Sequence, residues 1–204
     1  MVLGELGDKV VAAIGRSTDG ARDDFVEFRR WRPEWVPPMS QRGVANLIHE
    51  RIWAHLTLEL QPLLADGVRL IDREPLREVA VQLDSGRTYR LRFKRHSHRD
   101  LVRSYPTFSS LAFWGGPALA PTLDGMEEIH LAAGYRWVTE TSDVGAAVGS
   151  YREGKTNPIW VVEINAGAAG TAPISWSHAT PNLPLVDLEQ ALDDDVEGED
   201  GAGS

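Results

Sequence analysis

The chain has 204 residues, of which 42% are hydrophobic and 25% charged, values typical of a globular protein that buries one sizeable core. It contains no cysteine, which excludes disulfides, a thiolate nucleophile and a cysteine-ligated metal. The net charge is −9, but eight acidic residues and no basic ones fall within residues 187–204, so residues 1–186 carry only the remaining −1.

The start of the chain lacks the features of a secretory signal. Two acidic residues, Glu5 and Asp8, precede Lys9, and glycines interrupt the apolar residues around them. The longest apolar patch, residues 111–121, is short and broken by Gly and Pro, so we expect no membrane-spanning segment. These features predict a cytoplasmic protein. The frequent Ala, Gly, Arg and Asp indicate a bacterial source.

Helical periodicity dominates the first part of the chain. Hydrophobic residues recur at helical spacing at Leu3, Leu6, Val10 and Ile14. This predicts a helix over residues 2–16 that ends at the Ser-Thr-Asp-Gly turn, residues 17–20. A second helix should follow, because Asp23 and Asp24 suit its first turn and arginines its last turn. Pro33 should end it.

A proline-rich connector leads to the third helix. Residues 31–38 (Trp-Arg-Pro-Glu-Trp-Val-Pro-Pro) should be extended, with Trp31 and Trp35 packed on a neighbouring helix. A docking surface is the less favoured interpretation of these two tryptophans. Ser40 can cap the next helix. That helix carries one apolar stripe, formed by Val44, Leu47, Ile48, Ile52, Leu56, Leu60 and Leu63.

A hairpin with an unusual charge distribution follows. Apolar residues alternate with polar ones on both sides of the Asp-Ser-Gly-Arg turn at 84–87: Val79, Val81 and Leu83 before it, and Tyr89, Leu91 and Phe93 after it. The apolar residues should share one face, leaving a row of positive charge on the other. Residues 87–103 hold seven Lys and Arg residues against Asp100 alone, a local charge of +6.

The remaining chain predicts a second β unit. Residues 97–114 lose all periodicity and should form an irregular segment or short helix that closes one end of the sheet. A Pro- and Gly-rich loop spans 115–125. Strands are then expected at 129–138, 144–151 and 159–164, with a short edge strand at 174–176.

Helices before strands predict an α+β fold, with N-terminal helices packed on a mostly antiparallel β-sheet. We expect one domain over residues 1–186, helical in 1–67 and β-rich in 68–178. Residues 187–204 have the composition of an acidic disordered tail.

One segment fits the phosphate-binding pattern G-x4-G-K-[ST], with Gly149, Gly154, Lys155 and Thr156 as its defining residues. That loop requires a helix after it, whose N-terminus faces the phosphates. Here residues 159–162 (Ile-Trp-Val-Val) predict a strand instead. A hairpin turn is therefore favoured, and nucleotide binding is the third hypothesis.

Metal and catalytic motifs are incomplete. His49 and Glu50 begin an H-E-x-x-H pattern, but Trp53 occupies the second ligand position. His96 and His98 have metal-ligand spacing without a supporting carboxylate cluster. No G-x-S-x-G elbow is present. We therefore expect no metal and no cofactor, and we favour a role without catalysis.

The basic row and nearby aromatics are the candidate partner-binding surface: Arg87, Arg90, Arg92, Lys94, Arg95, His96, His98, Arg99, Arg103, Tyr105 and Phe108. The sequence predicts a protein-interaction module of the antitoxin, immunity or accessory type that binds another protein through this face. The alternative is a single-stranded nucleic-acid-binding protein whose acidic tail competes for the same surface. In either case the tail should dock loosely on the row. The oligomeric state stays open.

Overall fold

The computed structural model describes residues 2–73, 76–102, 107–114, 127–152 and 158–165. They form N-terminal helices packed on a six-stranded, mostly antiparallel sheet, which confirms the α+β prediction. The helices are α1 (Val2–Leu6), α2 (Asp8–Trp31), α3 (Gln41–Leu60) with the 3-10 turn η1 (Gln61–Leu63), and α4 (Phe108–Trp114). The strands are β1 (Val68–Arg73), β2 (Leu76–Gln82), β3 (Thr88–His96), β4 (Glu128–Val138), β5 (Asp143–Arg152) and β6 (Pro158–Ile164).

The predicted break at residues 17–20 is wrong, because α2 runs through it. The Ser17 hydroxyl donates to the Ala13 carbonyl at 2.6 Å and the Thr18 hydroxyl to the Ile14 carbonyl at 3.0 Å, so both polar side chains are satisfied inside the helix. Gly20 lies against the His55 ring of α3, and a Cβ there would come within 2.9 Å of the ring. The residues that resemble a turn therefore allow close helix packing.

The connector between α2 and α3 also differs from the prediction. It forms turns rather than an extended segment, with hydrogen bonds from Trp35 N to Arg32 O and from Met39 N to Val36 O, both 3.0 Å long. The expected cap of α3 is confirmed, since the Ser40 hydroxyl accepts a hydrogen bond from Gly43 N at 3.1 Å. The apolar stripe of α3 is buried as predicted, apart from the half-buried Leu47.

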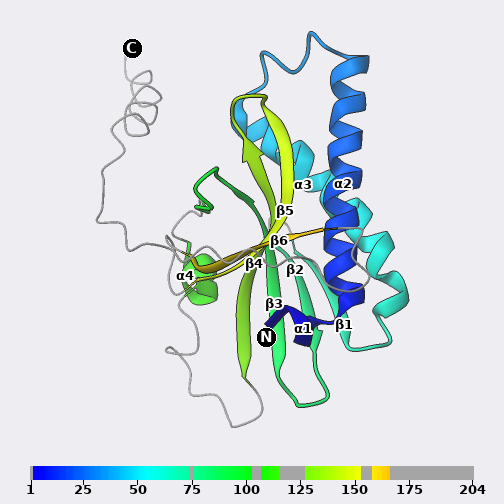
Figure 1. Ribbon diagram of the computed structural model, residues 1–204, viewed down its shortest axis with the longest axis vertical. Helices are drawn as coiled ribbons and strands as arrows, with labels where there is room; N and C mark the ends of the chain where they lie inside the picture. The colour runs from blue at the N-terminus through cyan, green and yellow to red at the C-terminus, as the bar shows by residue number, and fades with distance from the viewer. Residues whose placement is uncertain (1, 74–75, 103–106, 115–126, 153–157, 166–204) are drawn as a thin grey trace, which may run out of the picture.

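The sheet keeps its strands in chain order, β1 to β6. Neighbouring strands are antiparallel except β3 and β4, which are parallel. A parallel pair needs a crossover connection, and α4 lies in the chain between these two strands. Figure 1 shows α2 and α3 on one side of the sheet and α4 on the other. The helix α4 thus covers a face of the sheet, where the sequence predicted that this segment closes one end of it.

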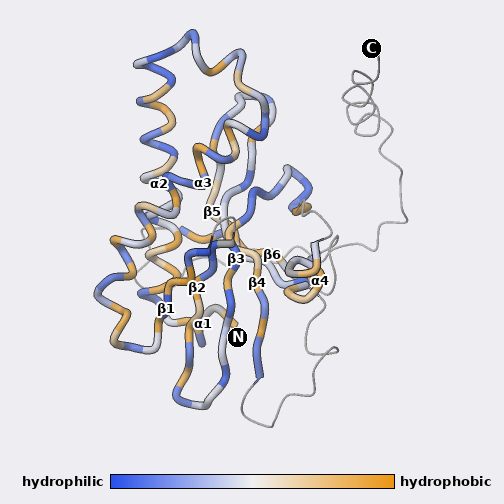
Figure 2. The backbone as a smooth tube through the Cα atoms, turned by 180° about the vertical axis from the view of Figure 1, so that it is seen from behind, coloured by the Kyte–Doolittle hydropathy of each residue, from blue (hydrophilic) through white to orange (hydrophobic). Residues whose placement is uncertain are grey.

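The main core lies between the sheet and the layer formed by α2 and α3. Alternate strand residues point into it, including the predicted hairpin residues Val79, Val81, Tyr89, Leu91 and Phe93. Figure 2 shows hydrophilic and hydrophobic residues interspersed along helices and strands alike, as expected of elements with one buried face. A smaller cluster beneath α4 contains Val102, Phe113, Trp114 and Ala132.

The three predicted strands after residue 127 are present as β4, β5 and β6. The predicted loop at 115–125, the edge strand at 174–176 and the tail at 187–204 lie outside the described residues. Among the described helices, none combines the length and hydrophobicity needed to cross a bilayer.

Candidate functional site

The hairpin of β2 and β3 has the two faces that the alternation predicts. Its register pairs Val81 with Tyr89 and Val79 with Leu91. Because side chains alternate along a strand, Arg90, Arg92, Lys94 and His96 share the face that points away from α2 and α3. The basic row therefore exists as a geometric feature.

The cations of this basic row are not all unpaired, because a buried carboxylate lies among them. Glu78 of β2 is fully buried and stands opposite Arg92 in the register. Its Oε1 accepts from Nε and Nη2 of Arg92 at 3.0 and 2.5 Å, and its Oε2 accepts from the same two atoms of Arg90 at 3.0 and 2.5 Å. Glu78 thus compensates two arginines by charge-assisted hydrogen bonds.

Further acidic residues come from distant parts of the chain. Arg87 pairs with Glu5 at 2.9 Å and with Glu127 at 3.1 Å, and Arg90 also lies 3.5 Å from Glu128. The local charge of +6 counted these cations against Asp100 alone, whereas the fold adds four glutamates. Glu78 could have been found from the sequence, since extending the hairpin register from the turn at 84–87 places it opposite Arg92.

The other members of the predicted surface are dispersed. Lys94 is half-buried, and burial together with the Arg92 charge lowers its pKa. Arg95 points to the opposite face, where its guanidinium lies over the Trp137 ring. His98 and Arg99 are exposed, and Phe108 on α4 is 90% exposed. Arg103 and Tyr105 lie outside the described residues. Partner binding by these residues stays a prediction.

His96 belongs to a buried polar network with Ser150 and Arg152 of β5. Its Nδ1 lies 3.3 Å from the Lys94 carbonyl, so Nδ1 carries the proton and Nε2 accepts from the Ser150 hydroxyl at 3.1 Å. Arg152 Nε donates to the same hydroxyl at 3.2 Å. Burial, with a smaller effect of the Arg152 charge, lowers the pKa of His96 to about 3. His96 and Ser150 are both fully buried, so neither side chain is accessible to a substrate in this conformation.

The neutral state of His96 should make stability depend on pH. The unfolded chain binds a proton at this histidine below a pKa of about 6.5, whereas the folded chain does not until about 3. The contribution of His96 to the free energy of unfolding is therefore complete above pH 6.5. It is lost as pH falls toward 3, by up to about 1.4 kcal/mol per pH unit. Urea unfolding at pH 7 and pH 5 measures this slope.

His96→Gln is the matched variant for that experiment, because it keeps a polar side chain that does not titrate. Its slope between pH 7 and pH 5 should be shallower than that of the wild type. The slope should not vanish, because burial also lowers the pKa of His49. Equal slopes in the two proteins would show that His96 titrates normally.

The segment that fits the phosphate-binding pattern begins inside β5 and ends before β6, and these two strands are antiparallel. Gly149 is in the middle of β5, and Arg152 of β5 pairs with Pro158 of β6. The expected strand therefore follows the pattern in place of a helix. Gly154, Lys155 and Thr156 lie outside the described residues. In the described part of the chain, no group of three or more His, Asp or Glu residues is placed to hold a metal ion.

Cations with few acidic partners gather instead at the end of the molecule where α2 stops and α3 starts. This basic end comprises Arg29, Arg30, Trp31, Arg32, Trp35, Arg42 and Arg95. The Arg95 side chain joins it through Gln41, the first residue of α3, at 3.3 Å. Arg29 reaches the Ser142 carbonyl in the β4–β5 turn at 3.4 Å. The end of α2, the start of α3, β3 and the β4–β5 turn therefore meet here.

Two tryptophans at the basic end are open to solvent. Trp31 is 65% exposed and Trp35 50% exposed. The Trp35 ring contacts Phe28 of α2 edge to face, with centroids 6.2 Å apart, so the predicted packing on a neighbouring helix is present only in part. The Arg32 guanidinium lies 4.3 Å from the Trp31 ring centroid and 5.1 Å from that of Trp35. The two indole rings also contact each other edge to face, with centroids 6.0 Å apart. They form a preassembled aromatic and cationic cluster.

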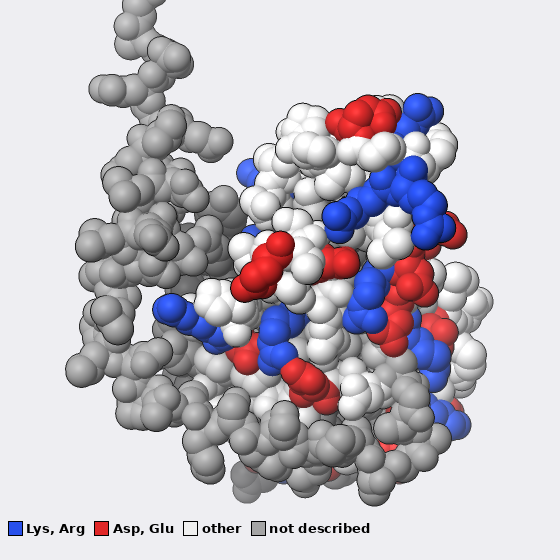
Figure 3. Space-filling model, turned by 45° about the horizontal axis from the view of Figure 1, so that its top comes forward, with Lys and Arg blue, Asp and Glu red and all other residues white. Residues whose placement is uncertain are grey.

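The basic end has few acidic neighbours among the described residues. Its one recorded ion pair joins Arg32 to Glu34 at 4.0 Å, the outer limit of such a contact. Glu140 and Asp143 lie in or beside the adjoining β4–β5 turn, and neither makes an ion pair with these arginines among the described residues. Figure 3, which tilts the top of Figure 1 forward, shows a band of Lys and Arg side chains in the upper right, with acidic and uncharged side chains around it.

Comparison with protein-family models, with curated proteins and with solved structures found no match to this chain. The sequence signal for the basic end was the connector itself, which places two tryptophans among prolines and next to three arginines. The direction in which those tryptophans point depends on turns of the connector, and these turns produce no hydrophobic periodicity in the sequence.

Proposed function

We propose that this protein is a cytoplasmic, non-catalytic interaction module that binds an acidic protein partner through its basic end. The observation that carries the proposal is the exposed Trp31–Arg32–Trp35 cluster. Trp and Arg are the residue types that contribute most binding energy at protein interfaces. An antitoxin, immunity or accessory protein would act in this way.

The two surfaces differ in what they offer a partner. A partner at the hairpin row would compete with Glu5, Glu78, Glu127 and Glu128 for the same arginines. At the basic end, Arg30 and Arg42 are exposed and have no ion pair among the described residues. Unpaired cations attract an acidic partner without first breaking internal contacts, which favours the basic end.

The test is affinity capture with the full-length protein and variants of it. The expected result is that Trp31→Ala and Trp35→Ala each weaken capture of an acidic partner about 30-fold, which corresponds to about 2 kcal/mol for a central aromatic residue. Phe108→Ala is the matched control, because Phe108 is an exposed aromatic residue on the opposite face of the sheet. If both Trp variants still capture the partner and Phe108→Ala does not, the partner-binding site lies on the face of the sheet that carries α4.

Single-stranded nucleic acid is the second candidate, favoured by the stacking of Arg32 on two exposed indole rings. This alternative predicts binding that weakens steeply with salt concentration and that either Trp variant abolishes. Titration of a labelled oligonucleotide at two salt concentrations distinguishes the candidates. A protein partner should leave nucleic-acid binding weak in all variants.

A further inference from the structure

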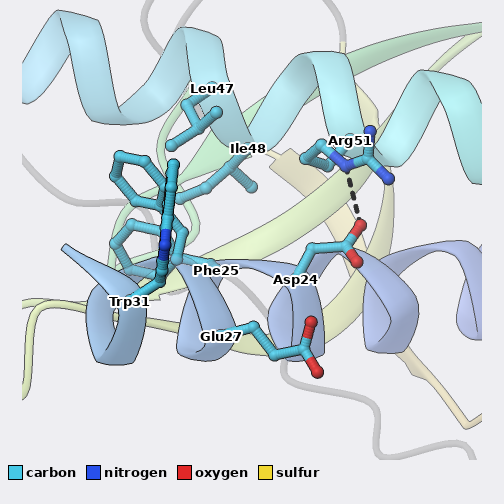
Figure 4. A pocket seen from close by; sticks show the side chains of 8 residues that line it. Asp24, Phe25, Glu27, Trp31, Leu47, Ile48 and Arg51 are labelled. Carbon is cyan, nitrogen blue, oxygen red and sulfur yellow. Dashed lines mark hydrogen bonds and ion pairs between the residues drawn. The ribbon is translucent and has the colours of Figure 1, made fainter.

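A groove between α2 and α3 opens next to the exposed tryptophans. It has a volume of about 330 Å³, and its apolar floor includes the buried side chains of Phe25 and Ile48. Figure 4 shows Trp31, Leu47 and Ile48 toward one end of the groove and the Asp24–Arg51 ion pair toward the other. The groove is therefore apolar beside the basic end and polar away from it.

The chain contains a segment of matching character outside the described residues. Leu185, Leu188, Leu192 and Val196 recur every three or four residues, which is the spacing of one helix face. Pro184 and Gly198 stand where helices commonly start and stop. Most of the positions between these apolar residues are acidic. An acidic helix with one apolar stripe is complementary to an apolar groove beside unpaired arginines.

Such a helix would not be stable alone. A helix of about 13 residues is marginal in water, and the aspartates at 193–195 would lie near its C-terminus, where the helix dipole disfavours negative charge. Both costs fall if the apolar stripe is buried and if cations lie near the aspartates. The groove offers the first condition and the basic end the second.

The connection to the sheet is long enough. The last residue of the described strands is Ile164, and residues 165–184 separate it from the acidic segment. Twenty residues span about 66 Å when fully extended, whereas a folded chain of 204 residues has a radius of gyration of about 17 Å. The segment can therefore reach the groove from anywhere on the sheet.

We propose that residues 185–196 of this chain dock in the groove between α2 and α3, with their leucines on the apolar floor and the following carboxylates beside the basic end. The segment then covers the surface to which an acidic partner binds. This regulatory role rests on the proposed function, although the docking itself does not. A partner must displace the segment, so partner binding is strengthened when the segment is detached.

The absence of cysteine makes a direct test feasible, because two introduced cysteines form a defined pair. Ala191→Cys is combined with Glu27→Cys, an exposed position that lines the groove. The control combines Ala191→Cys with Ser85→Cys, an exposed position in the β2–β3 turn next to the hairpin row. Both full-length proteins are oxidised mildly, and disulfide-linked peptides are quantified by mass spectrometry.

The groove pair should form an intramolecular disulfide at least about tenfold faster than the control pair, because docking raises the effective concentration of the two thiols. The rate should fall to the control rate with Leu188→Glu and Leu192→Glu added, and should drop at about 1 M salt, where charges are screened beyond about 3 Å.

Three results would overturn the inference. Equal rates in the two pairs would mean that the segment has no preferred position, and a faster control would place it on the hairpin row. Disulfide-linked dimers would mean that a second copy supplies the segment. No partner is present in this cross-linking experiment, so a negative result would not affect what the capture experiment with the Trp variants shows about partner binding. Conversely, rapid cross-linking would stand even if those variants lost no partner.

Discussion

Replacing Glu78 with Gln will lower the free energy of unfolding by about 3–5 kcal/mol, because it removes the charge that compensates two arginines around a buried site. Glu78 has no exposed surface, and Arg92 is 6% exposed. The amide of Gln can accept through only one oxygen, and its NH2 group would point hydrogen atoms at a guanidinium. Urea unfolding at pH 7 measures the change.

Glu128→Gln is the matched control, since the Glu128 side chain is 47% exposed and lies 3.5 Å from Arg90. An exposed pair of this kind contributes little, so its loss should change stability by less than about 1 kcal/mol. Adding Arg92→Met to Glu78→Gln should recover part of the loss, because one unpaired buried cation is removed. Similar losses in the two single variants would mean that Glu78 is solvated like a surface residue.

Replacing Gly134 with Ala should cost about 3 kcal/mol or more, or prevent folding, because the residue meets both a conformational and a steric barrier. Gly134 has φ of 152°, a region that L side chains rarely adopt. A Cβ at this position would lie 2.0 Å from the backbone oxygen of Lys94 on β3. Backbone atoms cannot rotate away as a side chain can. The substitution therefore strains the parallel pairing of β3 with β4.

Gly149→Ala is the control for this prediction, because Gly149 lies on the neighbouring strand β5 and its added Cβ would meet nothing closer than 3.5 Å. We expect its stability to change by about 1 kcal/mol or less, since Gly in a strand interior is itself slightly unfavourable. Thermal and urea unfolding of the two variants give the comparison. If both are tolerated equally, β3 and β4 can separate locally without loss of the fold.

Local patterns in the sequence were sufficient for most of the architecture. The α3 stripe, the Ser40 cap, the hairpin at 84–87 and the three strands after residue 127 were all predicted, because each depends on residues close in the chain. The break at residues 17–20 was predicted wrongly. Ser17 and Thr18 favour turns only while their hydroxyls lack a partner, and here the preceding helical turn supplies the acceptors.

Charge was the property that the sequence described least well. The sequence by itself determined that Arg90, Arg92 and Lys94 share one face of the hairpin, because alternation is a local property of a strand. Tertiary structure decided that Arg87 pairs with Glu5 and Glu127 and that Arg90 also pairs with Glu128, since these glutamates approach from segments whose positions no local pattern specifies. It also decided that Trp31 and Trp35 face solvent beside arginines with few acidic partners. Electrostatic pairing depends on distance in space, which only the folded chain sets.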